Sequence, residues 1–198
     1  MSDHYYSRNP DSTRDLREIR AQIHGRMFTF TTDSSVFAKR AVDYGTLTLI
    51  ERLPLPLDGT VLDVGCGYGP IGLTVASLSP DANVTMVDVN RRALDLCRLN
   101  AKRNGVGVVE IVESDGLSEL IGRQFDWVIT NPPIRAGKRV VYRIFEEAHD
   151  HLRPNGEFWL VIQKKQGAPS AITKLQTLFS QVEIVARDKG YNIIRCRK

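Results

Sequence analysis

The stretch Val61–Leu73, VLDVGCGYGPIGL, decides the fold of this chain of 198 residues. It opens with an apolar run typical of a buried strand, continues with glycines at alternate positions, and leads into a segment whose apolar residues Ile71, Val75 and Leu78 recur at helical spacing. Glycine permits positive φ and lets a ligand approach the main chain closely. A strand, a glycine turn and a helix in this order predict an open α/β sheet with a ligand at the turn.

Acidic residues end the next two predicted strands. Asp88 closes the strand predicted at 83–87 and lies 19 positions beyond Gly69, a spacing at which a carboxylate can accept hydrogen bonds from ribose hydroxyls. Asp115 follows the strand predicted at 107–112, although Asp115-Gly116 is also an ordinary turn signal. Because the carboxyl ends of parallel strands meet at one edge of a sheet, these acids predict a nucleoside pocket there.

The loop Asn131-Pro132-Pro133-Ile134 follows the apolar strand predicted at 125–130. A residue before proline is kept out of the helical region, so the two prolines hold Asn131 and Pro132 extended. We expect the Asn131 amide oxygen and the Pro132 carbonyl to accept the N–H bonds of a substrate amino group, with Ile134 against the face of the base. The alternative is a proline-stiffened turn without a catalytic role.

Strand and helix patterns alternate along the chain. Further strands are predicted at 60–65, 156–162, 182–187 and 191–196, and Asp188-Lys189-Gly190 between the last two indicates an antiparallel hairpin. The clearest helix is predicted at 138–152 and is stopped by Arg153-Pro154-Asn155-Gly156. Its apolar stripe comprises Val141, Ile144, Phe145, Ala148 and Leu152. The pattern predicts an α/β fold with a mostly parallel sheet, a terminal antiparallel pair and helices on both faces.

The glycine turn differs from a dinucleotide site, whose third glycine comes three positions after the second. With Asp63 inside it and a proline directly after it, the motif resembles the S-adenosylmethionine (SAM) site of class I methyltransferases. The resemblance implies a Rossmann-like fold of seven strands with SAM as the cofactor. It places Asp63 and the turn around the methionine portion, Asp88 on the ribose and Asp115 near the adenine amine. The cofactor-binding residues that it implies are Asp63, Gly65, Cys66, Gly67, Gly69, Asp88, Val89, Asp115, Gly116 and Asn131.

Within this superfamily, Asn-Pro-Pro followed by an apolar residue is similar to enzymes that methylate exocyclic or amide nitrogens. The stretches Val36–Thr46 and Asn131–Lys138 resemble the RsmC-type small-subunit (16S) ribosomal RNA guanine-N2 methyltransferases, in a single-domain form. This resemblance implies a methyltransferase domain at 25–198 after an amino-terminal extension at 1–24. It also implies methyl transfer from SAM to a guanine N2 amine, with Asn131, Pro132, Pro133 and Ile134 as catalytic residues. The alternatives are methylation of adenine N6 or protein glutamine, and a SAM-binding or RNA-binding module without turnover.

The net charge of +4 permits a nucleic-acid partner, and the distribution of the basic residues is more informative. Four of them follow the Asn-Pro-Pro loop with no acid between them, namely Arg135, Lys138, Arg139 and Arg143. We expect them to bind the phosphate backbone of ribosomal RNA or of the small ribosomal subunit beside the pocket. The alternative is a solvated helix face in which Arg143 pairs with Glu146 or Glu147.

The remaining composition argues against several classes of protein. The sequence has no run of 18 uncharged apolar residues and no signal-peptide pattern, so neither a membrane span nor secretion is expected. The three cysteines, Cys66, Cys97 and Cys196, are scattered, which favours reduced thiols in the cytoplasm over a disulfide frame or a zinc site. No metal is expected, and the oligomeric state stays open.

Overall fold

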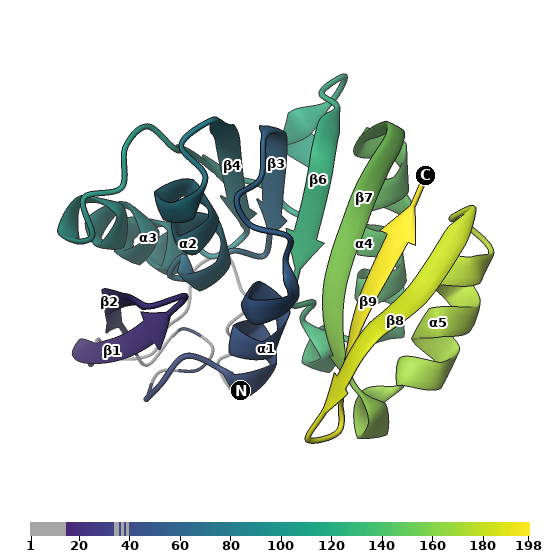
Figure 1. Cartoon of the computed structure of the whole chain (residues 1–198), viewed down its shortest axis with the longest axis horizontal. Helices are drawn as coiled ribbons and strands as arrows, with labels where there is room; N and C mark the ends of the chain where they lie inside the picture. The colour runs from purple at the N-terminus through teal and green to yellow at the C-terminus, as the bar shows by residue number, and fades with distance from the viewer. Residues whose placement is uncertain (1–14, 34–35, 37, 39) are drawn as a thin grey trace.

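The central sheet has the strand order β5-β4-β3-β6-β7-β9-β8 in the computed structural model (Figure 1). The structure describes residues 15–33, 36, 38 and 40–198. Strands β3 to β7 pair in parallel, whereas β9 is antiparallel to both β7 and β8. The chain runs outward from β3 through β4 and β5 and then returns to β6, on the other side of β3. Such a reversal opens a crevice at the carboxyl ends of the strands.

The elements have these bounds in chain order. They are β1 (Arg17–Ile23), β2 (Arg26–Thr32), α1 (Tyr44–Arg52), β3 (Gly59–Val64), α2 (Pro70–Leu78), β4 (Ala82–Asp88), α3 (Arg91–Arg103), β5 (Glu110–Glu113), η1 (Ser118–Leu120), β6 (Phe125–Thr130), η2 (Ile134–Ala136), α4 (Lys138–His151), β7 (Leu152–Gln163), η3 (Lys164–Gln166), α5 (Ala168–Gln176), β8 (Gln181–Asp188) and β9 (Tyr191–Arg197), where η marks a 3₁₀ helix.

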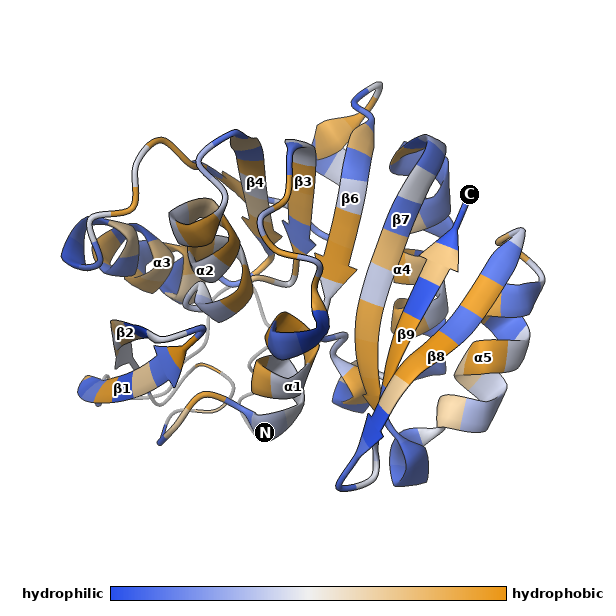
Figure 2. Ribbon diagram, viewed as in Figure 1, coloured by the Kyte–Doolittle hydropathy of each residue, from blue (hydrophilic) through white to orange (hydrophobic). Residues whose placement is uncertain are grey.

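Helices cover both faces of this sheet. Helices α1, α2 and α3 pack on one face and α4 and α5 on the other, so that each face has its own hydrophobic cluster. Successive residues of β3 point to opposite faces: Val61 belongs to the first cluster and Leu62 to the second. In Figure 2, the lower parts of β6 and β7, which lie between the helix layers, are continuously orange. The predicted fold class is confirmed.

Two predicted boundaries are wrong. Strand β7 begins at Leu152, which pairs with Phe125 of β6, so the segment that was expected to separate helix from strand belongs to β7. The proline and the Asn-Gly pair in this segment favour a turn locally, but pairing with β6 keeps the segment in the sheet. The turn preference is still visible, because Asn155 has a φ of 65° and the register between β6 and β7 shifts there. Strand β5 covers only Glu110–Glu113 because the chain before it is a loop in which Val108 is fully exposed. The predicted apolar stripe of the helix is confirmed as buried, although its last residue, Leu152, lies at the start of β7.

The hairpin of β1 and β2 was not predicted. Its two-residue turn is formed by His24 and Gly25, both with positive φ, and Ile23 pairs with Arg26. Ile19 and Ile23 of β1 belong to the same core as α1, α2 and α3. The expected division of the chain between residues 24 and 25 falls in this turn and stays a prediction, and residues 1–14 of the expected extension lie outside the described residues.

Two asparagines, one in α3 and one at its C-cap, tie the hairpin to the sheet domain. The Asn100 side-chain oxygen accepts the Thr31 N–H at 2.7 Å, and its amide group donates to the carbonyls of Thr31 at 3.0 Å and Tyr68 at 2.9 Å. Asn104 makes the matching pair of bonds with Thr29, both at 2.9 Å. The two amides therefore substitute for a neighbouring strand along β2 and hold it beside the glycine turn, which contains Tyr68.

Candidate active site

A cavity of about 790 Å³ lies at the carboxyl ends of β3, β4 and β6. These ends point toward the lower part of Figure 1, where α1 lies. The predicted site residues that line the cavity are Gly65, Cys66, Gly67, Asp88, Val89, Asp115, Gly116, Asn131, Pro132, Pro133, Ile134, Arg135, Arg139 and Arg143. Asp63, Gly69 and Lys138 do not line it. The fold thus brings most of the predicted site residues together at the cavity, from five separate segments of the chain.

The glycine turn forms one wall. Gly65 and Gly67 have φ of 71° and 58°, and a Cβ atom on either would meet nothing within 4 Å, so the missing side chains leave open space for a ligand against the main chain. The Gly65 and Cys66 N–H groups both bond the Val87 carbonyl at 2.9 Å, which fixes the turn onto β4. Gly69 serves packing instead: a Cβ there would lie 2.6 Å from Leu73, the first buried leucine of α2.

Asp88 supports this wall from β4. One carboxylate oxygen accepts the Gly67 N–H at 2.8 Å, and the other accepts the Asn90 N–H at 2.8 Å. Burial raises the pKa of Asp88 to about 6, and the main-chain N–H donors at Asn90, Gly67 and Val89 oppose that rise. Asp88 therefore fixes the glycine turn and still lines the cavity with a carboxylate.

Asp63 lies beneath the turn and is completely buried. Its Oδ2 accepts the Gly72 N–H at 2.8 Å, whereas Oδ1 has no hydrogen-bond partner among the described residues. Burial raises the pKa of Asp63 to about 7, the Gly72 N–H lowers it, and the charge of Asp88 raises it further. Asp63 therefore lies below the cavity without lining it, and it adds negative potential there only when it is ionised.

Asp115 and Arg143 meet each other at the cavity. Arg143 donates to the Asp115 carboxylate, and its Nε also lies 3.8 Å from a Glu147 oxygen. The Asp115 bond is the main cause that raises the pKa of Arg143 above its ordinary range. The Arg143–Glu147 pair that the alternative named is therefore present, and phosphate binding by Arg143 stays a prediction. Glu147 in turn accepts the Leu117 N–H at 2.9 Å and packs against Gly116.

The Asn-Pro-Pro loop presents a fixed amide. Asn131 Nδ2 donates to Thr46 Oγ1 at 2.8 Å and to Asp43 Oδ2 at 3.2 Å. Since a carboxylate only accepts hydrogen bonds, Asp43 specifies which end of the amide is the NH₂ group. The Asn131 Oδ1 atom has no partner among the described residues, and it belongs to a side chain that lines the cavity. The Pro132 carbonyl accepts the Ile134 N–H at 2.9 Å, which leaves one lone pair for a further donor.

Several cavity residues were not predicted as site residues. They include Val36, Ala38, Asp43, Thr46, Tyr68, Asn90, Ser114, Gln166 and Tyr191. Asp43 caps α1 by accepting the Thr46 N–H at 3.0 Å, so an aspartate three residues before a threonine at a helix start was a usable signal for the helix. Nothing in that pattern indicates that α1 points at the Asn-Pro-Pro loop 85 residues away, because that contact depends on tertiary packing.

Residues 27–195 match the family model described as the methyltransferase small domain. The chain belongs to this family. The resemblance to class I methyltransferases predicted from the sequence is thereby confirmed, and SAM is the cofactor.

Several known proteins are similar to this methyltransferase. The uncharacterized protein YbxB of Bacillus subtilis is 50% identical over the whole length of both chains. The ribosomal RNA small subunit methyltransferase C of Shewanella loihica is 34% identical over 82% of this chain and 47% of its own length. The T. thermophilus 16S rRNA N2 methyltransferase RsmC, solved with AdoMet and guanosine, matches with a TM-score of 0.83 and 26% identity over 96% of this chain and 52% of its own. The chain thus spans about half the length of these two rRNA methyltransferases.

The residues of the cavity fit SAM. Gly65 and Gly67 leave a main-chain cradle that a Cβ atom on either residue would fill. Beside it, the Asp88 carboxylate can accept hydrogen bonds from hydroxyl groups. The carboxylates of Asp63 and Asp88 also favour a ligand with positive charge. When bound, SAM supplies a methyl group on a cationic sulfur, which is transferred as an electrophile.

Two further findings concern membranes and metals. No helix in the described ranges is long and apolar enough to cross a membrane. Among the same residues, no three His, Cys, Asp or Glu side chains are grouped as metal ligands.

Proposed function

We propose that this methyltransferase transfers a methyl group from SAM to the exocyclic N2 amine of a guanine in small-subunit ribosomal RNA. The observation that carries the proposal is the fixed Asn131 amide, whose NH₂ end is held by Asp43 and Thr46 and whose oxygen remains free to accept a hydrogen bond. The RsmC structure was solved with guanosine, and this supports guanine as the base. The shared family supports RNA as the substrate class.

The chemistry of an aromatic amine explains why an acceptor is the group required. The lone pair of guanine N2 is delocalised into the ring, so the amine is a weak nucleophile and depends on orientation. Asn131 Oδ1 accepts one N–H bond and the remaining lone pair of the Pro132 carbonyl accepts the other, which turns the nitrogen lone pair toward the methyl carbon. As the nitrogen–carbon bond forms, the carbon–sulfur electron pair goes to sulfur and positive charge grows on nitrogen, where Asn131 stabilises it. The nitrogen then loses a proton to water, so no buried base is needed.

Each part of SAM is assigned to residues of one cavity wall. In this proposal Gly65, Cys66 and Gly67 enclose the methionine portion, with Asp63 and Gly69 supporting the turn from below. Asp88, beside Val89, accepts from the ribose hydroxyls, while Asp115 and Gly116 border the adenine. Arg143 then acts as a partner of Asp115 rather than as a phosphate ligand, because its guanidinium is already bonded.

The base reaches the pocket from a single strand or after flipping, because a paired guanine keeps its N2 amine inside the duplex. Ile134 at the cavity wall offers apolar contact to the base face. Arg135 and Arg139 also line the cavity, and Lys138 is exposed next to them. These three cations have no carboxylate partner within the described residues, so they remain available to phosphates.

Radiolabelled SAM offered together with total RNA, isolated small ribosomal subunits or ribosomal protein tests the proposal. We expect label in small-subunit RNA and N2-methylguanosine as the product nucleoside by mass spectrometry. N6-methyladenosine or methylated glutamine in protein would instead support one of the other amino acceptors, and an unlabelled set of acceptors would support a module without turnover.

A further inference from the structure

The contacts that hold the Asn131 amide come from a part of the chain that has no role in the proposed reaction. Thr46 lies in the first turn of α1 and is almost completely buried, and its hydroxyl oxygen is the nearest partner of the amide, at 2.8 Å. Asp43 caps the same helix and bonds both the Thr46 N–H and the Asn131 amide with one carboxylate oxygen. The direction of the amide therefore depends on where the first turn of α1 lies.

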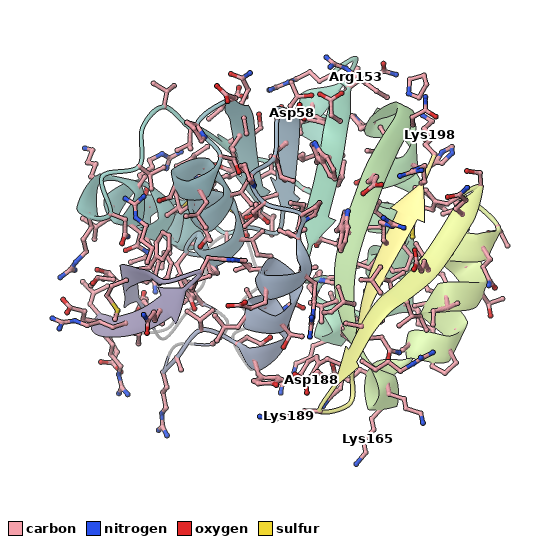
Figure 3. The ribbon with its side chains drawn as sticks, in the orientation of Figure 1. Asp58, Arg153, Lys165, Asp188, Lys189 and Lys198 are labelled. Carbon is pink, nitrogen blue, oxygen red and sulfur yellow. The ribbon has the colours of Figure 1, made fainter. Side chains whose placement is uncertain are left out.

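The β8–β9 hairpin fixes that turn of the helix. The Tyr44 hydroxyl donates to Asp188 at 2.5 Å, the Lys189 ammonium group lies 4.4 Å from the centre of the Tyr44 ring, and the Tyr44 and Tyr191 rings lie 6.0 Å apart. Asp188 and Lys189 lie at the hairpin tip, next to the start of α1 in the same view (Figures 1 and 3).

Gly45 allows α1 to pack closely against Tyr191 of the β8–β9 hairpin. A Cβ atom at Gly45 would lie 2.7 Å from two ring atoms of Tyr191 and 3.0 Å from the Asp43 carboxylate. A ring held by its neighbours cannot yield as the end of a flexible side chain can, so the helix approaches the hairpin at the distance that glycine allows. Helix, hairpin and catalytic loop thus form one packed unit at the cavity.

We propose that Thr46 and Asp43 are positioning residues for methyl transfer, and that the Tyr44–Asp188 hydrogen bond keeps them in place. They orient the Asn131 amide so that its oxygen faces the amine of the substrate. An amide without them can turn its NH₂ group toward the amine, and two donors facing each other repel. The inference rests on the proposed role of Asn131 as the acceptor.

A double-mutant cycle with Asn131→Ala tests this inference. Thr46→Val keeps the shape of the side chain and removes the acceptor, so it lowers the single-turnover rate of methyl transfer about tenfold and leaves the SAM dissociation constant within about twofold. Thr46→Ser restores the rate. In the Asn131→Ala background Thr46→Val has no further effect, because the amide that it orients is gone. Tyr44→Phe shows the same coupling with a smaller loss.

Thr48→Val is the matched control. Thr48 lies in the same helix, is similarly buried and donates its hydroxyl to the Tyr44 carbonyl at 2.8 Å, but it makes no bond to Asn131. Its effect on the rate is expected to be the same with and without Asn131. An equal loss for Thr46→Val in both backgrounds would mean that Thr46 acts only through stability and would overturn the inference.

An NMR measurement keeps the inference separate from the proposed function. In the wild-type protein, the two side-chain amide protons of Asn131 should show contacts to the Thr46 side chain, and these contacts should be lost in Thr46→Val. That pattern supports the positioning role even if the acceptor proves to be another amine. Amide protons of Asn131 without contacts to Thr46 would overturn it, whatever substrate the enzyme methylates.

Discussion

At the scale of single residues, two buried aspartates near the cavity make the stability of the protein depend on pH. Asp63 and Asp88 have pKa values raised by burial to about 7 and about 6, above the 3.8 of an exposed aspartate. The folded protein therefore holds protons that the unfolded chain releases between about pH 4 and pH 7. The stability that these groups contribute is complete below pH 3.8 and is lost as the pH rises through 6 and 7. A cationic ligand in the cavity offsets that loss.

We expect the melting temperature of the SAM-free protein to fall between pH 5 and pH 8, and to fall less in Asp63→Asn. Asn keeps an acceptor for the Gly72 N–H and has no charge to bury, so at pH 8 the variant should gain on the order of a few kcal/mol relative to wild type. Thermal unfolding across this pH range measures it. Parallel curves for the two proteins would show that Asp63 is not the group that titrates.

Asp88 allows a second prediction at this scale. Asp88→Ala should weaken SAM binding by about 1.5–3 kcal/mol, because the ribose hydroxyls lose a charged acceptor. Since the carboxylate also bonds the Gly67 and Asn90 N–H groups, Asp88→Asn is the informative companion: it retains one acceptor for the turn and loses the charge. Calorimetric titration that gives wild-type affinity for both variants would remove Asp88 from the cofactor site.

At the scale of secondary-structure elements, local pattern predicted most of the fold. The apolar runs of β3 and β6 and the stripe of α4 are buried as expected, because their periodicity reflects a face that packs. The hairpin β1–β2 was missed although Ile19, Ala21 and Ile23 alternate with polar residues, since interleaved charges obscure so short a strand. The start of β7 was also missed, because its pairing with Phe125 is a tertiary effect.

The candidate site likewise has one part that local sequence motifs predict and another that depends on tertiary packing. The glycine turn, Asp88 and Asn131 were predictable because each belongs to a local strand-end motif. The bonds from Asp43 and Thr46 to Asn131 span 88 and 85 residues, and the Asp115–Arg143 pair spans 28, so no local pattern indicates them. This is also why the sequence left open whether Arg143 contacts RNA or an acid.

Asn100 of α3 and Asn104 at its C-cap support a prediction about how elements are held together. Asn100→Ala should destabilise the protein by about 2–4 kcal/mol, because it leaves the Thr31 N–H and two main-chain carbonyls buried without partners. Asn104→Ala, at a partly buried position, should cost about 1 kcal/mol. Denaturant unfolding of both variants checks the order. Equal, small losses would show that the β1–β2 hairpin does not depend on these amides.

At the scale of the whole molecule, groups of cations lie at both ends of the strands of the sheet. At the edge away from the cavity, Arg123 and Arg153 pair with Glu110 and Asp126. At the cavity edge, the described residues include exposed cations without a carboxylate partner, which we term the basic rim: Arg135, Lys138, Arg139, Lys164, Lys165 and Lys189. Figure 3 shows Lys165 and Lys189 at this edge and Arg153 at the opposite one. Exposed cations without a carboxylate partner can bind phosphate groups at this end of the strands.

Removing Arg135, Lys138 and Arg139 together should weaken RNA binding and flatten its dependence on salt by about two to three units of slope, with SAM affinity unchanged. The double variant Arg123→Ala, Arg153→Ala is the matched control, since those cations already have partners, and it should leave the slope as it is. A salt slope that responds equally to both sets would mean that the basic rim is an ordinary solvated surface.

The most direct measurement of the central claim is single-turnover methyl transfer by Asn131→Ala beside wild type, with SAM affinity determined on the same samples. If the fixed amide oxygen holds the substrate amine, the variant should be slower by roughly 10²-fold or more while SAM affinity stays near that of wild type. Wild-type turnover in Asn131→Ala would contradict the account, because the amide would then have no part in the transition state.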